Sequence, residues 1–166
     1  MTTKILVPLN RSDYSREILT HIEKLMPASK SELVLFFITH PPRGMGFASP
    51  DPSSGYAMKP GGEPVGPAAH PIYAHQQEDS IRSEVEVFLI PMMKHLRELG
   101  YATTLKVCFG DNSVEEIIEV ANEEKVDLIA MSTRAQDGVR RFFFGDIADK
   151  VMKEVKVPVL LIHPEV

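Results

Sequence analysis

The sequence predicts an α/β fold, in which a five-stranded parallel sheet is covered by helices on both faces. Five short apolar runs alternate along the chain with segments of helical periodicity. The apolar runs are mostly unbroken, which is typical of strands buried on both faces of a parallel sheet. Helices that connect such strands form right-handed crossovers and pack on both sides of the sheet.

Composition and charge narrow the class of protein. The chain has 166 residues, of which 43% are hydrophobic and 25% charged, and we expect one domain over 1–166. A net charge of −5 argues against nucleic-acid partners and acidic membranes. No apolar stretch is long enough to span a membrane, and the N-terminus has no signal-peptide layout, so we expect a cytoplasmic protein. The single cysteine, Cys108, excludes an internal disulfide and is interpreted as a buried, inert thiol.

The first strand, helix and second strand are predicted from residues 5 to 38. An apolar run at 5–7 is closed by Pro8, and Ser12 or Asp13 can cap the helix that follows. Pro27 ends this helix, and 33–38 forms the second apolar run. The apolar face of the helix consists of Ile18, Leu19, Ile22, Leu25 and Met26.

A long helix is predicted from about 78 to 99, and the second half of the chain repeats the alternation. Pro91 should kink the long helix, and Gly100 suits the position after its end. Strands are predicted at 103–109, 127–131 and 157–162, and helices from about 114 to 121 and 146 to 155. Pro158 lacks a backbone N–H, so we expect the last strand at a sheet edge.

One segment, at about 41–77, is predicted to be an insertion loop. Residues 41–75 hold eight of the thirteen prolines and six of the ten glycines, with only four charged residues. This composition buries too little apolar surface to offset the entropy of ordering. The loop is either a solvated insertion or a functional lid or dimer-contact arm. His40, His70 and His75 have no acidic or thiol partner at a suitable spacing, so we predict no metal site.

Several segments, taken in order, resemble the universal stress protein family. They are Lys4 to Ser12, Val107 to Asp111 before Glu115 to Ile118, Asp127 to Met131, Lys150-Val151, and Val157 to Ile162. The resemblance covers the chain outside the insertion loop. It implies a Rossmann-like fold of the adenine nucleotide alpha hydrolase type. It also implies a homodimer, in many members through the last strand, here 157–162.

The resemblance also implies candidate binding residues. ATP-binding members carry Gly-x-x-Gly, nine residues, and then Gly followed by Ser or Thr. This pattern places Ser132, Ala135, Gly145 and Asp146 at the four signature positions, with Thr133 and Arg134 between the first two. Ile147 follows the motif, Pro8 and Asn10 end the first strand, and Ile38 matches the strand end that contacts adenine.

Only one of the three signature glycines, Gly145, is present. Residues other than glycine at such positions cost roughly 1–2 kcal/mol and bring a Cβ toward the phosphate. Asp146 is expected at the N-terminus of the fourth helix, where the family holds phosphate and where this carboxylate can cap the helix instead. Arg134, Arg140 and Arg141 can neutralise phosphates or pair with aspartates, or they form a solvated charged face.

Three functions remain open from the sequence. The first is a dimeric stress-response regulator that acts through an unidentified regulatory protein partner and binds ATP weakly or not at all. The second is a switch that binds ATP, AMP or another adenine nucleotide through the altered loop. The third is an enzyme, either a slow ATPase or a phosphate-transfer catalyst, which is disfavoured because the sequence offers no Walker-type lysine and no paired nucleophile and base. We therefore predict no catalytic residues.

Overall fold

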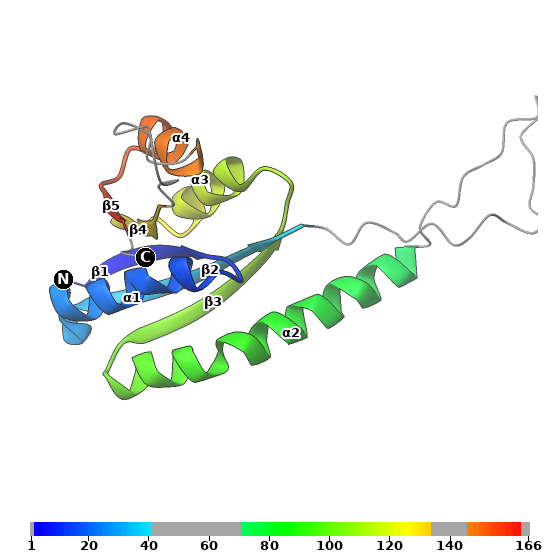
Figure 1. The fold of residues 1–166 in the computed structure, drawn as a ribbon, viewed down its shortest axis with the longest axis horizontal. Helices are drawn as coiled ribbons and strands as arrows, with labels where there is room; N and C mark the ends of the chain where they lie inside the picture. Colours follow the sequence, from blue (N-terminus) through cyan, green and yellow to red (C-terminus); the bar gives the residue numbers. More distant parts are fainter. Residues whose placement is uncertain (1, 41–70, 134–145, 164–166) are drawn as a thin grey trace, which may run out of the picture.

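The described part of the chain is a parallel α/β sandwich. The computed structural model describes residues 2–40, 71–133 and 146–163 (Figure 1). The strands are β1 (Thr3–Leu9), β2 (Ser31–Thr39), β3 (Ala102–Phe109), β4 (Leu128–Ser132) and β5 (Val159–Ile162). The helices are α1 (Asp13–Leu25), α2 (Pro71–Glu98), α3 (Ser113–Glu123) and α4 (Asp146–Glu154), with a 3-10 turn at Ala28–Lys30. The predicted fold class is confirmed.

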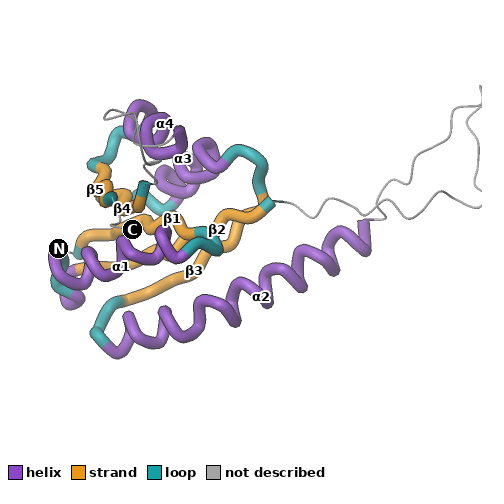
Figure 2. The backbone as a smooth tube through the Cα atoms, in the orientation of Figure 1, coloured by secondary structure: helices purple, strands orange, loops and turns teal. Residues whose placement is uncertain are grey.

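The order of the strands creates one reversal in the sheet. The five strands lie in the order β3-β2-β1-β4-β5, and every neighbouring pair is parallel (Figure 2). From β1 the chain builds outward to β3 and then returns to the other side through β4 and β5. The crevice beyond the carboxyl ends of β1 and β4 is therefore the switch point, where ligands bind in open α/β sheets.

Two apolar clusters pack on the two faces of the sheet. One face is covered by α1 and α2, which lie below α3 and α4 in Figure 1. The other face is covered by α3 and α4. Successive side chains of a central strand enter opposite clusters, because strand side chains alternate between the two faces of a sheet. In β1, Ile5 lies in the first cluster and Leu6 in the second.

The helix ends follow the predicted signals. Ser12 caps α1 by accepting a hydrogen bond from the Ser15 backbone N–H, and Asn112 caps α3 through its side-chain oxygen. Gly100, just after α2, has a φ of 94°, in the left-handed region that suits glycine. These ends satisfy backbone groups that a helix leaves unpaired.

Two proline positions differ from the prediction. α2 begins at Pro71 rather than near 78, so 71–77 is helical and does not belong to the predicted loop. Proline suits the first helical position because the N–H that it lacks is unpaired there in any helix. β1 does not stop before Pro8 but continues to Leu9. Pro158 directly precedes β5, which lies at a sheet edge as predicted.

Other predictions fall on residues outside those described. The 41–70 part of the insertion loop and the 134–145 part of the phosphate-loop motif are among them. Within 2–40, 71–133 and 146–163, no helix is both long and apolar enough to cross a membrane.

Candidate functional site

A cavity of about 660 Å³ lies at the switch point of the sheet. Its walls come from the carboxyl ends of β1, β2 and β4 and from the first turns of α1 and α4, with the start and middle of α3. The lining residues are Pro8, Leu9, Asn10, Arg11, Ser12, Tyr14, Ser15, Ile38, Ser113, Ile117, Met131, Ser132, Thr133, Asp146, Ile147 and Ala148.

The cavity opens where β1 and β4 separate. The two strands pair only at Ile5 with Leu128 and at Leu6 with Ile129. The Lys4 backbone N–H donates to the Asp127 carboxylate, and the Lys4 carbonyl accepts from the Asp127 backbone N–H. The backbone N–H and C=O groups of the even-numbered residues of β1 therefore lie on the side of β4. Pro8 therefore turns its nitrogen, which has no hydrogen, toward the side where β1 has already left β4. A central strand tolerates proline here because no ladder hydrogen bond is lost.

Short hydrogen bonds fix the turn between β1 and α1. The Asn10 side-chain oxygen accepts a hydrogen bond from the Ser12 backbone N–H at 2.8 Å. The Ser15 hydroxyl accepts from the Asn10 backbone N–H at 3.1 Å and donates to backbone carbonyls of the same turn. This network commits the Asn10 oxygen to the turn, so the group that Asn10 can offer to the cavity is its NH₂ donor.

The end of β4 brings a buried hydroxyl to the cavity. Within the described part of the chain, the Ser132 hydroxyl is buried and has no hydrogen-bond partner. Thr133, the next residue, is buried and donates its backbone N–H to the Ile162 carbonyl at 2.9 Å. Leaving a buried hydroxyl unpaired costs about 1–3 kcal/mol, and a polar ligand atom beside Ser132 would remove this cost.

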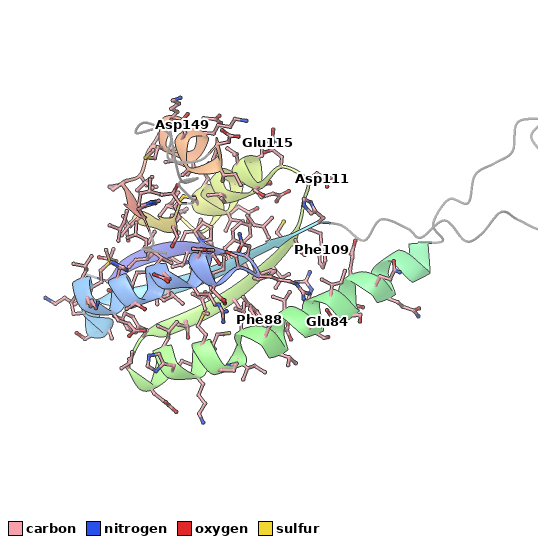
Figure 3. All side chains as sticks on the ribbon, viewed as in Figure 1. Glu84, Phe88, Phe109, Asp111, Glu115 and Asp149 are labelled. Carbon is pink, nitrogen blue, oxygen red and sulfur yellow. The ribbon has the colours of Figure 1, made fainter. Side chains whose placement is uncertain are left out.

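The charges around the cavity attract an anion, except close to the Asp146 carboxylate, which repels it. The cap and first turn of α1 and the first residues of α3 and α4 line the cavity, so the partial positive charges of three helix N-termini lie at its wall. Arg11 also lines it and pairs with Glu84 of α2, labelled in Figure 3, at 3.2 Å. Asp146 opposes these charges, because its exposed carboxylate belongs to the first turn of α4.

The structure brings together seven of the ten predicted site residues. Pro8, Asn10, Ile38, Ser132, Thr133, Asp146 and Ile147 all line the cavity. Arg134, Ala135 and Gly145 lie outside the described residues. Whether the seven bind a ligand stays a prediction. Asp146 is the first residue of α4, so its carboxylate lies at the helix N-terminus as expected.

Sequence reasoning missed other lining residues. Arg11 and Tyr14 belong to the turn between β1 and the start of α1. The helix-capping signal at Ser12 identifies that turn in the sequence, so these two residues could have been predicted. Ser113 and Ile117 come from α3, which the chain order places far from the motif. Only the strand order, with β1 between β2 and β4, brings α3 to this cavity.

The described lining of the cavity is both apolar and polar. It combines apolar surface from Ile38, Ile117 and the 45% exposed Ile147 with hydroxyl and amide groups. The groups whose pKa values move furthest, Cys108 and Glu124, do not line it. Among the described residues, no group of three or more His, Cys, Asp or Glu side chains is placed to hold a metal ion.

Comparison with known proteins gives one consistent result. The model of the universal stress protein family matches residues 1–163. Universal stress protein Sll1388 of Synechocystis sp. is 25% identical over 162 residues, which is 96% of this chain and 97% of that protein.

Two solved structures show the same fold. One is that of MJ0577 of Methanocaldococcus jannaschii, with a TM-score of 0.71 and 19% identity over 100% of this chain and 99% of that chain. The other is a universal stress protein family protein from Arabidopsis thaliana with AMP bound. It has a TM-score of 0.59 and 14% identity over 98% of this chain and 92% of that chain.

Proposed function

Because the chain belongs to the universal stress protein family, we propose that it is a stress-response regulator whose cavity takes an adenine nucleotide with a short phosphate chain and binds ATP weakly. The regulator acts through contacts with a partner protein. One observation carries the proposal: Asp146 lines the same cavity as Pro8, Asn10 and Ile38. This shared lining supports one site in which the nucleoside would lie toward β2 and the phosphates toward Asp146.

The side of the cavity toward β2 suits an adenosine group. Ile38 and Ile117 supply apolar surface from β2 and α3, and the Asn10 amide supplies a donor. Such a combination of apolar walls with a few fixed polar groups is typical of small-molecule sites. The AMP-bound relative from Arabidopsis thaliana supports this choice of ligand.

The side toward α4 disfavours a long phosphate chain. Each phosphate charge added beyond the first approaches the Asp146 carboxylate. For exposed charges several ångströms apart, this repulsion is about 1 kcal/mol per charge, or roughly a fivefold loss of affinity. The helix N-termini and Arg11 still favour a single phosphate group at a greater distance from Asp146.

Isothermal titration calorimetry on a charge-neutral variant tests the proposal. Asp146→Asn removes the carboxylate and should raise ATP affinity roughly fivefold or more while changing AMP affinity less. Asp149→Asn is the matched control, because it removes one negative charge from the same helix at a residue that does not line the cavity and pairs with Lys153 at 2.6 Å. Equal gains in the two variants would attribute the effect to net charge and contradict the proposal.

We further propose that the protein forms a homodimer through β5. This strand ends the sheet, and Val159, Leu160 and Leu161 are only partly buried. Pairing of two such edges would satisfy outward backbone groups and cover these side chains. Sedimentation equilibrium of the full chain should give twice the monomer mass, and a Leu160→Lys variant should give the monomer mass.

A further inference from the structure

The opposite edge of the sheet, formed by β3, has the length and the adjacent groove that an added strand would need. β3 is eight residues long, and α2 runs beside it (Figures 1 and 2). A groove of about 930 Å³ borders this edge and is lined by α2 on one side, by α3 on the other, and by Leu105 to Cys108 of the strand. A sixth strand placed there would lie between two helices, as an inner strand of the sandwich does.

Apolar side chains around the groove favour association at this edge. Leu105 and Val107 are partly buried, and Ile90 of α2, which also lines the groove, is 55% exposed. Long edge strands with apolar surroundings are sites of edge-to-edge association unless something blocks them.

Two arginines from α2 occupy the outward carbonyls of β3. The Arg97 side chain donates to Thr103, from Nε to the hydroxyl at 3.0 Å and from Nη2 to the backbone carbonyl at 3.3 Å. Arg82 Nη1 donates to the Val107 carbonyl at 3.3 Å, and its guanidinium lies 5.6 Å from the ring centre of Phe109, labelled in Figure 3. Each arginine thus has a second contact that holds it at the edge.

The position of these nitrogens blocks a ladder. An added strand would place its own amide nitrogen about 2.9 Å from each outward carbonyl, where the guanidinium groups now lie. Backbone groups of alternate residues share one side of a strand, so those of Thr103, Leu105, Val107 and Phe109 face outward. The Thr103 and Val107 carbonyls are bonded to arginines, and the other two outward carbonyls, of Leu105 and Phe109, are separated by the covered Val107 carbonyl. Isolated paired residues of this kind do not hold a strand.

We infer that Arg82 and Arg97 close the β3 edge against a strand of a second copy of this chain, and so confine self-association to the rest of the surface. The inference does not depend on nucleotide binding. It assigns to two exposed arginines a role in selecting the mode of assembly.

Analytical ultracentrifugation of Arg82→Ala/Arg97→Ala beside the wild type tests the inference. The double variant should associate beyond the wild-type state as its concentration rises, with a mass about twofold higher. Lys24→Ala/Lys94→Ala is the control: it removes two positive charges from exposed helix positions, one of them in the same groove, and leaves the β3 carbonyls covered. The control should keep the wild-type mass.

Hydrogen exchange identifies the surface that associates. The Leu105 amide should exchange more slowly in the associated double variant than in the wild type, because it joins a new ladder. A folded double variant with wild-type mass would overturn the inference, and so would association that leaves Leu105 exchange unchanged. If the double variant loses its cooperative unfolding transition, the single variants Arg82→Ala and Arg97→Ala carry the test, and wild-type mass in both would overturn it.

Discussion

Replacing Glu124 by glutamine should destabilise the protein by removing a charge that joins three elements. Glu124 is the C-cap residue of α3. Its carboxylate forms salt bridges with Lys4 of β1, at 2.5 Å from Nζ to Oε2, and with Lys106 of β3. These two cations, above all through the hydrogen bond from Lys106, lower the pKa of Glu124 from 4.5 to about 2. Glutamine keeps the shape of the side chain and removes its charge.

The size of the effect follows from the displaced pKa. A fall of the Glu124 pKa from 4.5 to about 2 corresponds to at most about 3.5 kcal/mol. The Glu124 side chain is 22% exposed and its lysine partners 26% and 38% exposed, so solvent screens part of this energy. We expect Glu124→Gln to lower the free energy of unfolding by about 1–2 kcal/mol and the melting temperature by about 2–8 °C.

Thermal and urea unfolding at several pH values measure the effect. Because the folded-state pKa lies below the unfolded value, the contribution of Glu124 is complete above about pH 4.5 and disappears as the pH falls toward 2. The difference between wild type and variant should follow the same course. Glu123→Gln is the control, since Glu123 is 58% exposed and lies 3.7 Å from Lys106.

Two results would contradict a charge-based role for Glu124. One is equal destabilisation by Glu123→Gln and Glu124→Gln at neutral pH. The other is a loss in Glu124→Gln that persists unchanged at pH 2, since a protonated carboxyl no longer attracts the lysines.

Two further predictions concern single contacts. Burial, with the nearby Glu116 carboxylate that accepts the thiol hydrogen bond at 2.8 Å, raises the pKa of Cys108 to about 11. Iodoacetamide should therefore alkylate Cys108 at pH 8 roughly a hundredfold more slowly than a free thiol, as followed by mass spectrometry. Glu116→Gln should restore only part of the rate. Alkylation of wild-type Cys108 at the rate of a free thiol would contradict this prediction. The Tyr101 hydroxyl donates to the Met26 carbonyl at 2.6 Å, just after α1. Tyr101→Phe should cost about 1 kcal/mol in chemical unfolding, and an unchanged midpoint would mean that water replaces the bond fully.

The fold was predictable because local signals and tertiary packing agree. The apolar run that became β2 is unbroken and is buried on both faces. Ser12 marks a helix start through its side-chain oxygen, and Gly100 marks a helix end through its left-handed backbone. The start of α2 was not predictable in the same way. The many prolines and glycines before Pro71 obscured a proline that suits a helix start.

The candidate site was predictable only where the family motif reaches it. Ser132, Asp146 and Ile38 stand at strand or helix ends that the motif identifies, and they line one cavity. Ser113 and Ile117 carry no local signal for this site, because their presence depends on the strand order. The Ser132 hydroxyl, which has no partner among the described residues, and the arginines at the β3 edge are properties of tertiary structure alone.

The ratio of the AMP and ATP dissociation constants tests whether Asp146 limits the phosphate chain that the cavity accepts. Isothermal titration calorimetry of the wild-type protein with AMP and with ATP, without Mg²⁺, measures how the cavity treats a lengthening phosphate chain. AMP should bind roughly 25-fold more tightly than ATP, because each of the two added charges approaches Asp146 and costs about fivefold in affinity. ATP binding as tightly as AMP, or the absence of binding by either nucleotide, would contradict this prediction.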